Sequence, residues 1–221
     1  MIRIAHASDT HEHPGIVSAV ADVECDAIVL TGDILNNKGR VPATHYRIDP
    51  ATECKYQNAW LRKVAKKWAA AFAGRPVIYV GGNHDFIGIE RWLNHYGHTN
   101  LHVITTENPS VEVAGKRFAG FREVPWIAGE WVGETHDLRP CVERAMACNP
   151  DILVTHAPPV GILDGDDGYG VHPLSPALFY GEHKITHHLF GHYHRDGGKI
   201  MTENGIVFAN AAGHLMVHDV P

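Results

Sequence analysis

Five short polar motifs in the 221-residue sequence carry side chains of the types that bind divalent metal ions in proteins. They are Asp9-Thr10-His11, Gly32-Asp33, Gly82-Asn83-His84-Asp85, Thr155-His156 and Gly191-His192-Tyr193-His194. Carboxylates, an amide oxygen and imidazoles suit Mn, Fe or Zn, and the lack of cysteine in the set argues against a structural zinc site. One ion takes about four to six ligands, fewer than these motifs offer. The surplus predicts two ions that share one bridging carboxylate, an arrangement that clamps a phosphoryl group during in-line displacement.

Each motif follows a short β-branched run that has the character of a buried strand. These runs are Ile2 to Ala7, Ala27 to Thr31, Pro76 to Val80, Ile152 to Thr155 and Leu189-Phe190. Helical patterns lie between several of them, at Pro14 to Val23, Cys54 to Ala73 and Asp137 to Ala147. The alternation predicts an α/β fold with a largely parallel sheet, whose ligands gather at the carboxyl ends of the strands.

Shorter strand-like pieces replace this pattern from about Leu101 onward. They are Leu101 to Thr105, Ser110 to Val113, Lys116 to Phe121, Lys199 to Met201, Ile206 to Ala209 and Leu215 to His218. Such hairpin-like pieces predict a second, mixed sheet. Two facing sheets with helices outside would bury both apolar faces without a break, so we expect one domain over residues 1–221.

The helix predicted over Cys54 to Ala73 has the clearest pattern. Aromatic and apolar residues at i, i+4 spacing predict its buried face, namely Tyr56, Trp60, Val64, Trp68 and Phe72. Basic residues point elsewhere, namely Arg62, Lys63, Lys66 and Lys67. We interpret them as a solvated helix face in preference to a nucleic-acid patch.

Composition narrows the class of protein. Apolar residues make up 44% and charged residues 20% of the chain, which excludes a disordered or collagenous protein. A net charge of −6 provides no positive field to attract duplex nucleic acid or anionic lipid. The 18 histidines nearly equal the 19 lysines and arginines together, an excess that favours metal binding.

We see no signal peptide and no apolar run near the ~20 residues of a membrane helix, so a cytoplasmic location with no membrane partner is expected.

Cysteine usage agrees with that expectation. Cys25, Cys54, Cys141 and Cys148 form no C-x-x-C pair and are too few to staple a chain of this length. We interpret them as reduced, half-buried residues.

Each candidate ligand taken alone has a simpler interpretation. Asp9 or Asp33 could cap a following helix, since Asp is a favoured N-cap. His156 could be a turn histidine, and His192 or His194 a surface residue. The occurrence of all five motifs in order favours the metal site over these alternatives.

In this order and spacing the motifs resemble those of the calcineurin-like metallophosphoesterases, whose pattern is D-x-H, G-D, G-N-H-[DE], a lone His and G-H-x-H. The resemblance runs from Asp9 to His194. It implies a four-layer α/β/β/α sandwich with two mixed sheets. It also implies that one ion is held by Asp9, His11, Asp33 and His194, and a second by Asp33, Asn83, His156 and His192, with Asp33 bridging.

The same resemblance implies the chemistry. A water between two dications would lose a proton near neutral pH, and the resulting hydroxide would attack phosphorus while the metals stabilise charge on the non-bridging oxygens. The equivalent of His84 faces the leaving oxygen in family members, so we assign His84 to protonation or charge stabilisation there. Family protein phosphatases extend the second motif to G-D-x-x-D-R-G, which this chain lacks after Asp33. A protein phosphatase is therefore not expected, and Asn36 or Asp85 is the candidate partner that orients His84.

Candidate substrate contacts lie in three loops. Arg40, His45 and Arg47 in the loop from Asn36 to Thr52 could neutralise a phosphate. Trp126 or Trp131, in the aromatic stretch from Val124, could stack a base. His172 ends the loop from Gly161 to Pro173 and His13 follows the first motif, so either could touch substrate. Five further histidines are interpreted as structural or solvated, namely His6, His183, His187, His188 and His214.

We expect a small phosphoester as partner and hydrolysis as the reaction. The first hypothesis is a dinuclear-metal phosphodiesterase for small nucleotide-like or aryl diesters. Pro125-Trp126 with the second Trp131, and His156-Ala157-Pro158-Pro159 with the loop after it, resemble the small metallophosphoesterase-domain branch associated with cyclic nucleotides. The second is a phosphomonoesterase with the same metal centre. The third is a non-catalytic interaction scaffold, which the complete ligand set disfavours.

Overall fold

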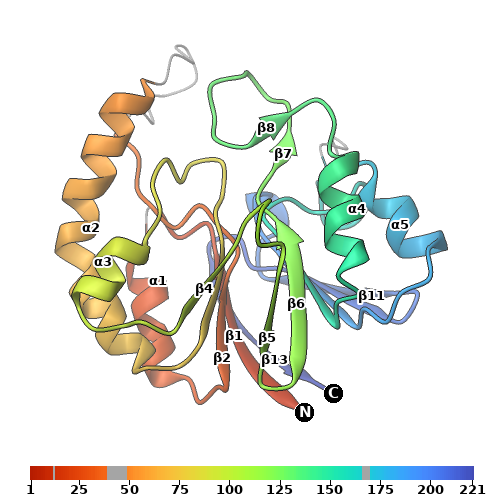
Figure 1. The fold of residues 1–221 in the computed structure, drawn as a ribbon, viewed down its shortest axis with the longest axis horizontal. Helices are drawn as coiled ribbons and strands as arrows, with labels where there is room; N and C mark the ends of the chain where they lie inside the picture. Colours follow the sequence, from red (N-terminus) through yellow and green to blue (C-terminus); the bar gives the residue numbers. More distant parts are fainter. Residues whose placement is uncertain (12, 39–48, 166–169) are drawn as a thin grey trace.

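Two large β-sheets face each other in the computed structural model, which describes residues 1–11, 13–38, 49–165 and 170–221 (Figure 1). The first sheet has the strand order β13-β1-β2-β3-β4. Its strands are β1 (Ile2–Ser8), β2 (Ala27–Leu30), β3 (Val77–Val80), β4 (Leu101–Ile104) and β13 (His214–Val220). β1 to β4 run parallel, and β13 pairs antiparallel with β1 at one edge.

The second sheet has the order β11-β12-β10-β9-β6-β5. Its strands are β5 (Ser110–Val113), β6 (Lys116–Phe121), β9 (Ile152–Thr155), β10 (His187–Phe190), β11 (Lys199–Glu203) and β12 (Ile206–Asn210). β6, β9, β10 and β12 are parallel, and the two edge strands pair antiparallel. A short parallel pair, β7 (Val124–Pro125) and β8 (Glu134–Thr135), lies beyond β6.

Helices cover the outer faces of both sheets. Figure 1 shows α1, α2 and α3 on one side of the paired sheets and α4 and α5 on the other. Their bounds are α1 (Gly15–Ser18), α2 (Pro50–Phe72), α3 (Glu90–His95), α4 (Arg139–Ala147) and α5 (Leu174–Tyr180). Two 3-10 turns add Ala19–Asp22 and His194–Asp196. Among the described residues, no helix is both long enough and apolar enough to cross a membrane.

Alternation along the strands divides the core into three apolar layers. Ile2 and Ile4 of β1 pack between the sheets with Phe118 of the second sheet. Ala5 of β1, on the opposite face, packs toward the helices with Trp68 of α2. A third cluster lies between the second sheet and α4 and α5. The predicted pair of mixed sheets with helices outside is thus confirmed. Each strand that is buried on both faces contributes side chains to two of the apolar layers.

The elements differ from the predictions mainly at their ends. α2 begins at Pro50 and not at Cys54, because the Asp49 carboxylate caps it by accepting the Ala51 N–H at 3.2 Å. The predicted helix from Pro14 to Val23 splits into α1 and a 3-10 turn. The short helices α3 and α5 were not predicted, since their six and seven residues give too few turns for a periodic pattern.

The predicted buried face of α2 is rotated slightly from the observed one. Trp68 and Phe72 are fully buried as expected, but Tyr56, Trp60 and Val64 are half-buried at its border. The centre of the buried face is instead polar near the start of the helix, where Glu53 and Gln57 are buried. The polar start of this face has a role in the site described below.

Several histidines outside the five motifs lie in the core. His6 of β1 and His218 of β13 have ring centroids 5.5 Å apart, and His6 Nε2 lies 2.9 Å from Thr31 Oγ1. His188 of β10 is buried, with Nε2 2.8 Å from Thr155 Oγ1. Burial lowers the pKa of His188 to about 3 and, together with His187, lowers that of His218 to about 4. Part of the histidine excess therefore belongs to the core and not to metal binding.

Replacing His188 with Gln will flatten the dependence of stability on pH. The pKa of His188 is about 3 in the folded chain and about 6.5 when unfolded, so the unfolded state binds the extra proton. The contribution of the neutral His188 to the free energy of unfolding is complete above about pH 6.5 and is lost as the pH falls. This loss is about 2 kcal/mol between pH 7 and pH 5. Urea unfolding at both pH values measures the effect. His188→Gln should lose that share of the dependence on pH, and equal slopes for the parent and His188→Gln would contradict the assignment.

Candidate metal centre

The side chains of the five motifs meet at one edge of the paired sheets. Asp9 follows β1, Asp33 comes after β2 and Asn83 after β3, while His156 and His192 follow β9 and β10. Because these strands are parallel within each sheet, their carboxyl ends lie at a common edge. The cluster is largely buried, with Asp9, His11, Asp33, Asn83 and His156 each exposed by 3% or less. The His194 side chain lies at its rim and is half exposed.

Three of these residues have a left-handed backbone. Asp9, Asp33 and His192 have φ angles of 50°, 51° and 68°. Such angles are uncommon for residues other than glycine and cost conformational free energy. Residues with strained backbones of this kind concentrate at functional sites. The left-handed turn ends each strand and places the side chain at the sheet edge.

Glycines in the motifs allow the loops to approach each other. A Cβ on Gly82 would collide with the Asp33 carboxylate and backbone, and one on Gly191 would collide with Ser8 Oγ and the Asp9 carboxylate. These two glycines therefore bring the third and fifth motifs against the two carboxylates.

The two oxygens of Asp9 have different surroundings. Oδ2 accepts hydrogen bonds from Ser8 Oγ at 2.6 Å and from the His192 N–H at 2.8 Å. Oδ1 faces His194 Nε2 at 3.2 Å. The protein thus fixes one oxygen and directs the other toward an imidazole of the cluster.

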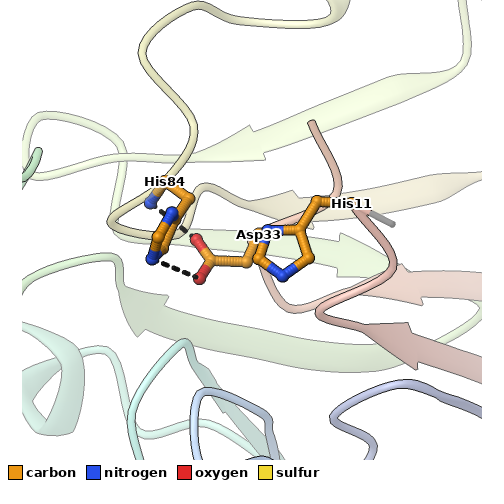
Figure 2. A group of neighbouring side chains, drawn as sticks. All are labelled: His11, Asp33 and His84. Atoms are coloured by element: carbon orange, nitrogen blue, oxygen red, sulfur yellow. Dashed lines mark hydrogen bonds and ion pairs between the residues drawn. The ribbon is translucent and has the colours of Figure 1, made fainter. Parts of the chain in front are cut away.

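Asp33 follows the same pattern at the centre of the cluster. Its Oδ1 accepts the His84 N–H at 2.7 Å. Its Oδ2 lies 3.3 Å from His156 Nε2 and 4.0 Å from His84 Nε2. Figure 2 shows the carboxylate directed toward the backbone N–H and imidazole of His84.

His156 is oriented to offer Nε2 as a donor atom. Its Nδ1 lies 2.7 Å from the Thr31 carbonyl, which can only accept a hydrogen bond, so Nδ1 carries the proton. Nε2 then lies 3.0 Å from Asn83 Oδ1 and 3.2 Å from His192 Nδ1. Two ligands about 2.1 Å from one ion at right angles are about 3 Å apart, so the spacing suits a shared cation.

Two groups of donor atoms result, and Asp33 belongs to both. One group contains His11, Asp33 and His84, and the other contains Asp33, His156 and His192, with all donor atoms in each group within 4.8 Å of one another. His84 lies close to the first group in addition to Asp9 and His194, which the resemblance implies for that ion and which lie 3.2 Å apart (Oδ1 to Nε2). Carboxylate and imidazole donors are the set expected for Mn, Fe or Zn, so the residues present fit divalent ions.

The ionisable side chains of the cluster shift one another's pKa values. Burial lowers the pKa of His156, but the Asp33 carboxylate outweighs burial and raises it to about 9. Burial and the neighbouring His156 lower the pKa of His192 to about 4. Burial raises the pKa of Asp33, yet His156 and His84 bring it well below its usual value. Asp33 is therefore an anion that a positive charge must balance.

His84 is oriented by Asn37, which corrects the prediction of Asn36 or Asp85. The Asn37 amide N–H groups donate to Glu53 Oε2 and to the His84 carbonyl, each at 3.2 Å, which fixes the direction of the amide. Asn37 Oδ1 therefore accepts from His84 Nδ1, 3.0 Å away. Asn36 instead bonds to Tyr56 Oη at 3.4 Å. The backbone turn after Asp33 decides which asparagine faces the imidazole, and the sequence does not reveal that turn.

The polar start of the buried α2 face supports this arrangement. Glu53 also accepts the Lys38 N–H at 3.0 Å. Gln57, one turn further along, donates to the His84 carbonyl at 2.7 Å and accepts the Phe86 N–H at 2.9 Å. Sequence reasoning missed both residues, although polar residues at i, i+4 beside an apolar stripe were a usable signal.

Asp85 has a structural role in the same loop. Its buried carboxylate accepts the Leu35 N–H at 3.0 Å, the Gly82 N–H at 2.9 Å and the Tyr79 hydroxyl at 2.9 Å. It therefore ties the second motif to the third, which explains why it does not reach His84.

Replacing Asp85 with Ala will destabilise the protein by about 3 kcal/mol or more. Three buried donors lose their acceptor, and each unsatisfied donor costs about 1–3 kcal/mol. Urea unfolding measures the loss, and Asp22→Ala on an exposed turn serves as the control. A change below about 1 kcal/mol would contradict the structural role.

The predicted substrate residues lie in different places. Trp131 packs on His84, with ring centroids 3.9 Å apart, and the neighbouring Val132 N–H donates to the Asn83 carbonyl at 3.1 Å. Trp126, which is 46% exposed, and His172, which is also exposed, line one pocket that includes none of the five motifs. His13 is exposed. Arg40, His45 and Arg47 lie outside the described residues.

Comparison with known proteins identifies the class. Two facing mixed sheets with a carboxylate–histidine cluster at their carboxyl edge define an α/β protein with a candidate metal site. A sequence model of the calcineurin-like phosphoesterases matches residues 2–196. The chain therefore belongs to the calcineurin-like phosphoesterase family, which hydrolyses phosphoesters with the help of divalent metal ions.

Two similar proteins give further context. The UPF0046 protein K07C11.7 of Caenorhabditis elegans is 24% identical over 221 residues, covering 96% of this chain and 69% of the relative. A crystal structure of a conserved uncharacterized protein, a predicted phosphoesterase from Streptococcus pneumoniae, is 17% identical with a TM-score of 0.39. That match covers 95% of this chain and 71% of the other.

Proposed function

We propose that the protein is a dinuclear-metal phosphodiesterase that hydrolyses small nucleotide-like or aryl phosphodiesters. The observation that carries the proposal is the position of Asp33, whose carboxylate belongs to both donor groups. A shared carboxylate is the usual bridge between two ions about 3.5–4 Å apart.

The residues divide between the two proposed ions. Asp33 would contribute to both sites. Asp9, His11 and His194 would hold one ion, and Asn83, His156 and His192 would hold the other. When bound, the two ions supply Lewis acidity and lower the pKa of an attacking water. His84, with Nδ1 bonded to Asn37, presents Nε2 for protonation or charge stabilisation at the leaving oxygen. Mn, Fe and Zn all suit these donors.

The charges around the cluster favour diesters over monoesters. The sequence offers few candidate cations for a phosphate, namely Arg40 and Arg47, which lie outside the described residues, and the described side chains that contact the Asp9 and Asp33 carboxylates come from Ser and His residues. A monoester dianion would gain from a denser cationic clamp, whereas a diester carries one negative charge. The formal net charge of −6 adds to this preference.

The test combines metal content with two aryl substrates. The purified protein is loaded with Mn, Fe or Zn, its metal content is measured by mass spectrometry, and kcat/KM is compared for bis(nitrophenyl) phosphate and nitrophenyl phosphate. Two ions per chain and a diester preference are expected. A single ion at full loading would overturn the dinuclear centre. A tenfold monoester advantage, about 1.4 kcal/mol in transition-state binding, would replace the proposal with a phosphomonoesterase.

The cell compartment is a separate part of the proposal. All four cysteines are free thiols in the structure, which supports a reducing compartment such as the cytoplasm. The partner is proposed to be the small phosphoester itself.

A further inference from the structure

Trp126 is an exposed indole that the protein holds in one orientation. Its ring stacks on His136, with centroids 4.3 Å apart and planes inclined by 18°. On another side its six-membered ring contacts Gly129, where any side chain would collide with it. Gly129 has a φ of +79°, a second reason for glycine at this position. An aromatic surface fixed in this way binds a planar partner with little further loss of conformational entropy.

A pocket of about 260 Å³ connects this indole to the metal centre. The described residues that line it are Pro125, Trp126, Ile127, His192 and Tyr193. His192 Nδ1 lies 3.2 Å from His156 Nε2, so the inner wall of the pocket is part of the second donor group. A group bound in this pocket is therefore next to any phosphorus that the proposed ions hold.

The lining suits an uncharged aromatic group. Pro125, Trp126, Ile127 and Tyr193 present aliphatic or aromatic surface, and such surface stabilises apolar groups removed from water. A cavity of about 150 Å³ is large enough for benzene, so this pocket has room for a substituted ring or a nucleobase.

The neighbouring pocket has a different character. It measures about 420 Å³, lies on the His136 side of Trp126, and includes Arg139 and His172. Arg139 is paired with Asp137 at 2.9 Å, so its charge is already balanced. The pocket of about 260 Å³ is thus the better placed for the ester group, because it includes the predicted metal ligand His192 and the larger pocket includes none of the predicted ligands.

We propose that Pro125, Trp126, Ile127 and Tyr193 form a subsite for a planar aromatic ester group of the substrate, with Trp126 as its stacking surface. The proposal rests on the proposed function for the position of the phosphorus. It separates the two tryptophans by role, because Trp131 packs on His84 and positions that imidazole, whereas Trp126 contacts the substrate.

Binding of non-hydrolysable phosphonates to the metal-loaded protein tests the subsite without relying on turnover. Calorimetry compares phenylphosphonate with methylphosphonate, which share the anionic group and differ in the ring. The parent protein should bind the phenyl compound more tightly. Trp126→Ala should reduce that ratio by roughly tenfold, within the range for loss of one stacking contact, while Trp126→Phe retains most of it. Tyr180→Ala, which removes an exposed aromatic residue elsewhere, should leave the ratio unchanged.

The outcomes separate the subsite from the proposed function. Equal affinities for the two phosphonates in the parent, or an unchanged ratio in Trp126→Ala, would overturn the subsite. An intact ratio in a protein that prefers monoesters would overturn the diesterase and retain the subsite. Phosphonate analogues of AMP and of ribose 5-phosphate then distinguish the sources of the ring: a Trp126-dependent gain with the AMP analogue supports a nucleobase, and its absence supports an aryl group in the same subsite.

Discussion

Asp33→Asn will lower the metal content to one ion per chain or fewer and reduce turnover by on the order of 10² to 10³ or more. The Asp33 carboxylate is the donor common to both groups, and an amide is neutral and a poor bridge. A bound ion supplies several kcal/mol of transition-state stabilisation, and each 1.36 kcal/mol corresponds to a factor of ten in rate. Metal analysis and steady-state rates on bis(nitrophenyl) phosphate measure the two effects.

The substitution is well suited to this question because it preserves the local fold. Asp33 Oδ1 accepts the His84 N–H, and an asparagine carbonyl can accept the same hydrogen bond. Asp151→Asn is the matched control, since Asp151 is a partly buried carboxylate just before β9, at the opposite end of that strand from His156. Asp151→Asn should keep its metal and rate. Unchanged metal content and rate in Asp33→Asn would exclude Asp33 as a bridge.

The sequence predicted the location of the site because each motif ends a buried strand. Parallel strands bring their carboxyl ends to one edge, so Asp9, Asp33 and Asn83 had to meet once the sheet was predicted. The glycines next to them added a second signal, since Gly82 and Gly191 permit the close approach of loops. That these residues bind metal stays a prediction.

The contacts around His84 could not be predicted in the same way. Asn36 and Asn37 are adjacent and chemically identical, and only the backbone conformation after Asp33 decides which one faces the imidazole. The face of α2 was misjudged because large aromatic residues outweighed Glu53 and Gln57 in the periodic pattern, although these two polar residues are buried where the helix meets the site. Local hydrogen bonds decide where such buried polar side chains lie, and the hydrophobic periodicity of a sequence does not predict those bonds.

His84→Ala will retain the metal and the fold but lose turnover by roughly 10² to 10⁴, the range for a positioned acid or base. The imidazole is held for this task, since Asn37 fixes Nδ1 and Trp131 packs on the ring. Loss of the side chain removes no contact to the Asp33 Oδ1 atom, which bonds the backbone N–H of residue 84. Metal analysis, circular dichroism and steady-state kinetics together test this separation of roles.

The dependence on the leaving group tests the role of His84 more sharply than the rate itself. A nitrophenolate leaves with little protonation, so the loss in His84→Ala should be smaller for nitrophenyl esters than for alkyl esters. Asn37→Ala should show a weaker loss with the same dependence, because it leaves the imidazole in place without its partner on Nδ1. Equal losses for both ester classes in His84→Ala would show that His84 does not protonate the leaving oxygen, and would assign it instead to stabilising charge on the phosphoryl group in the transition state.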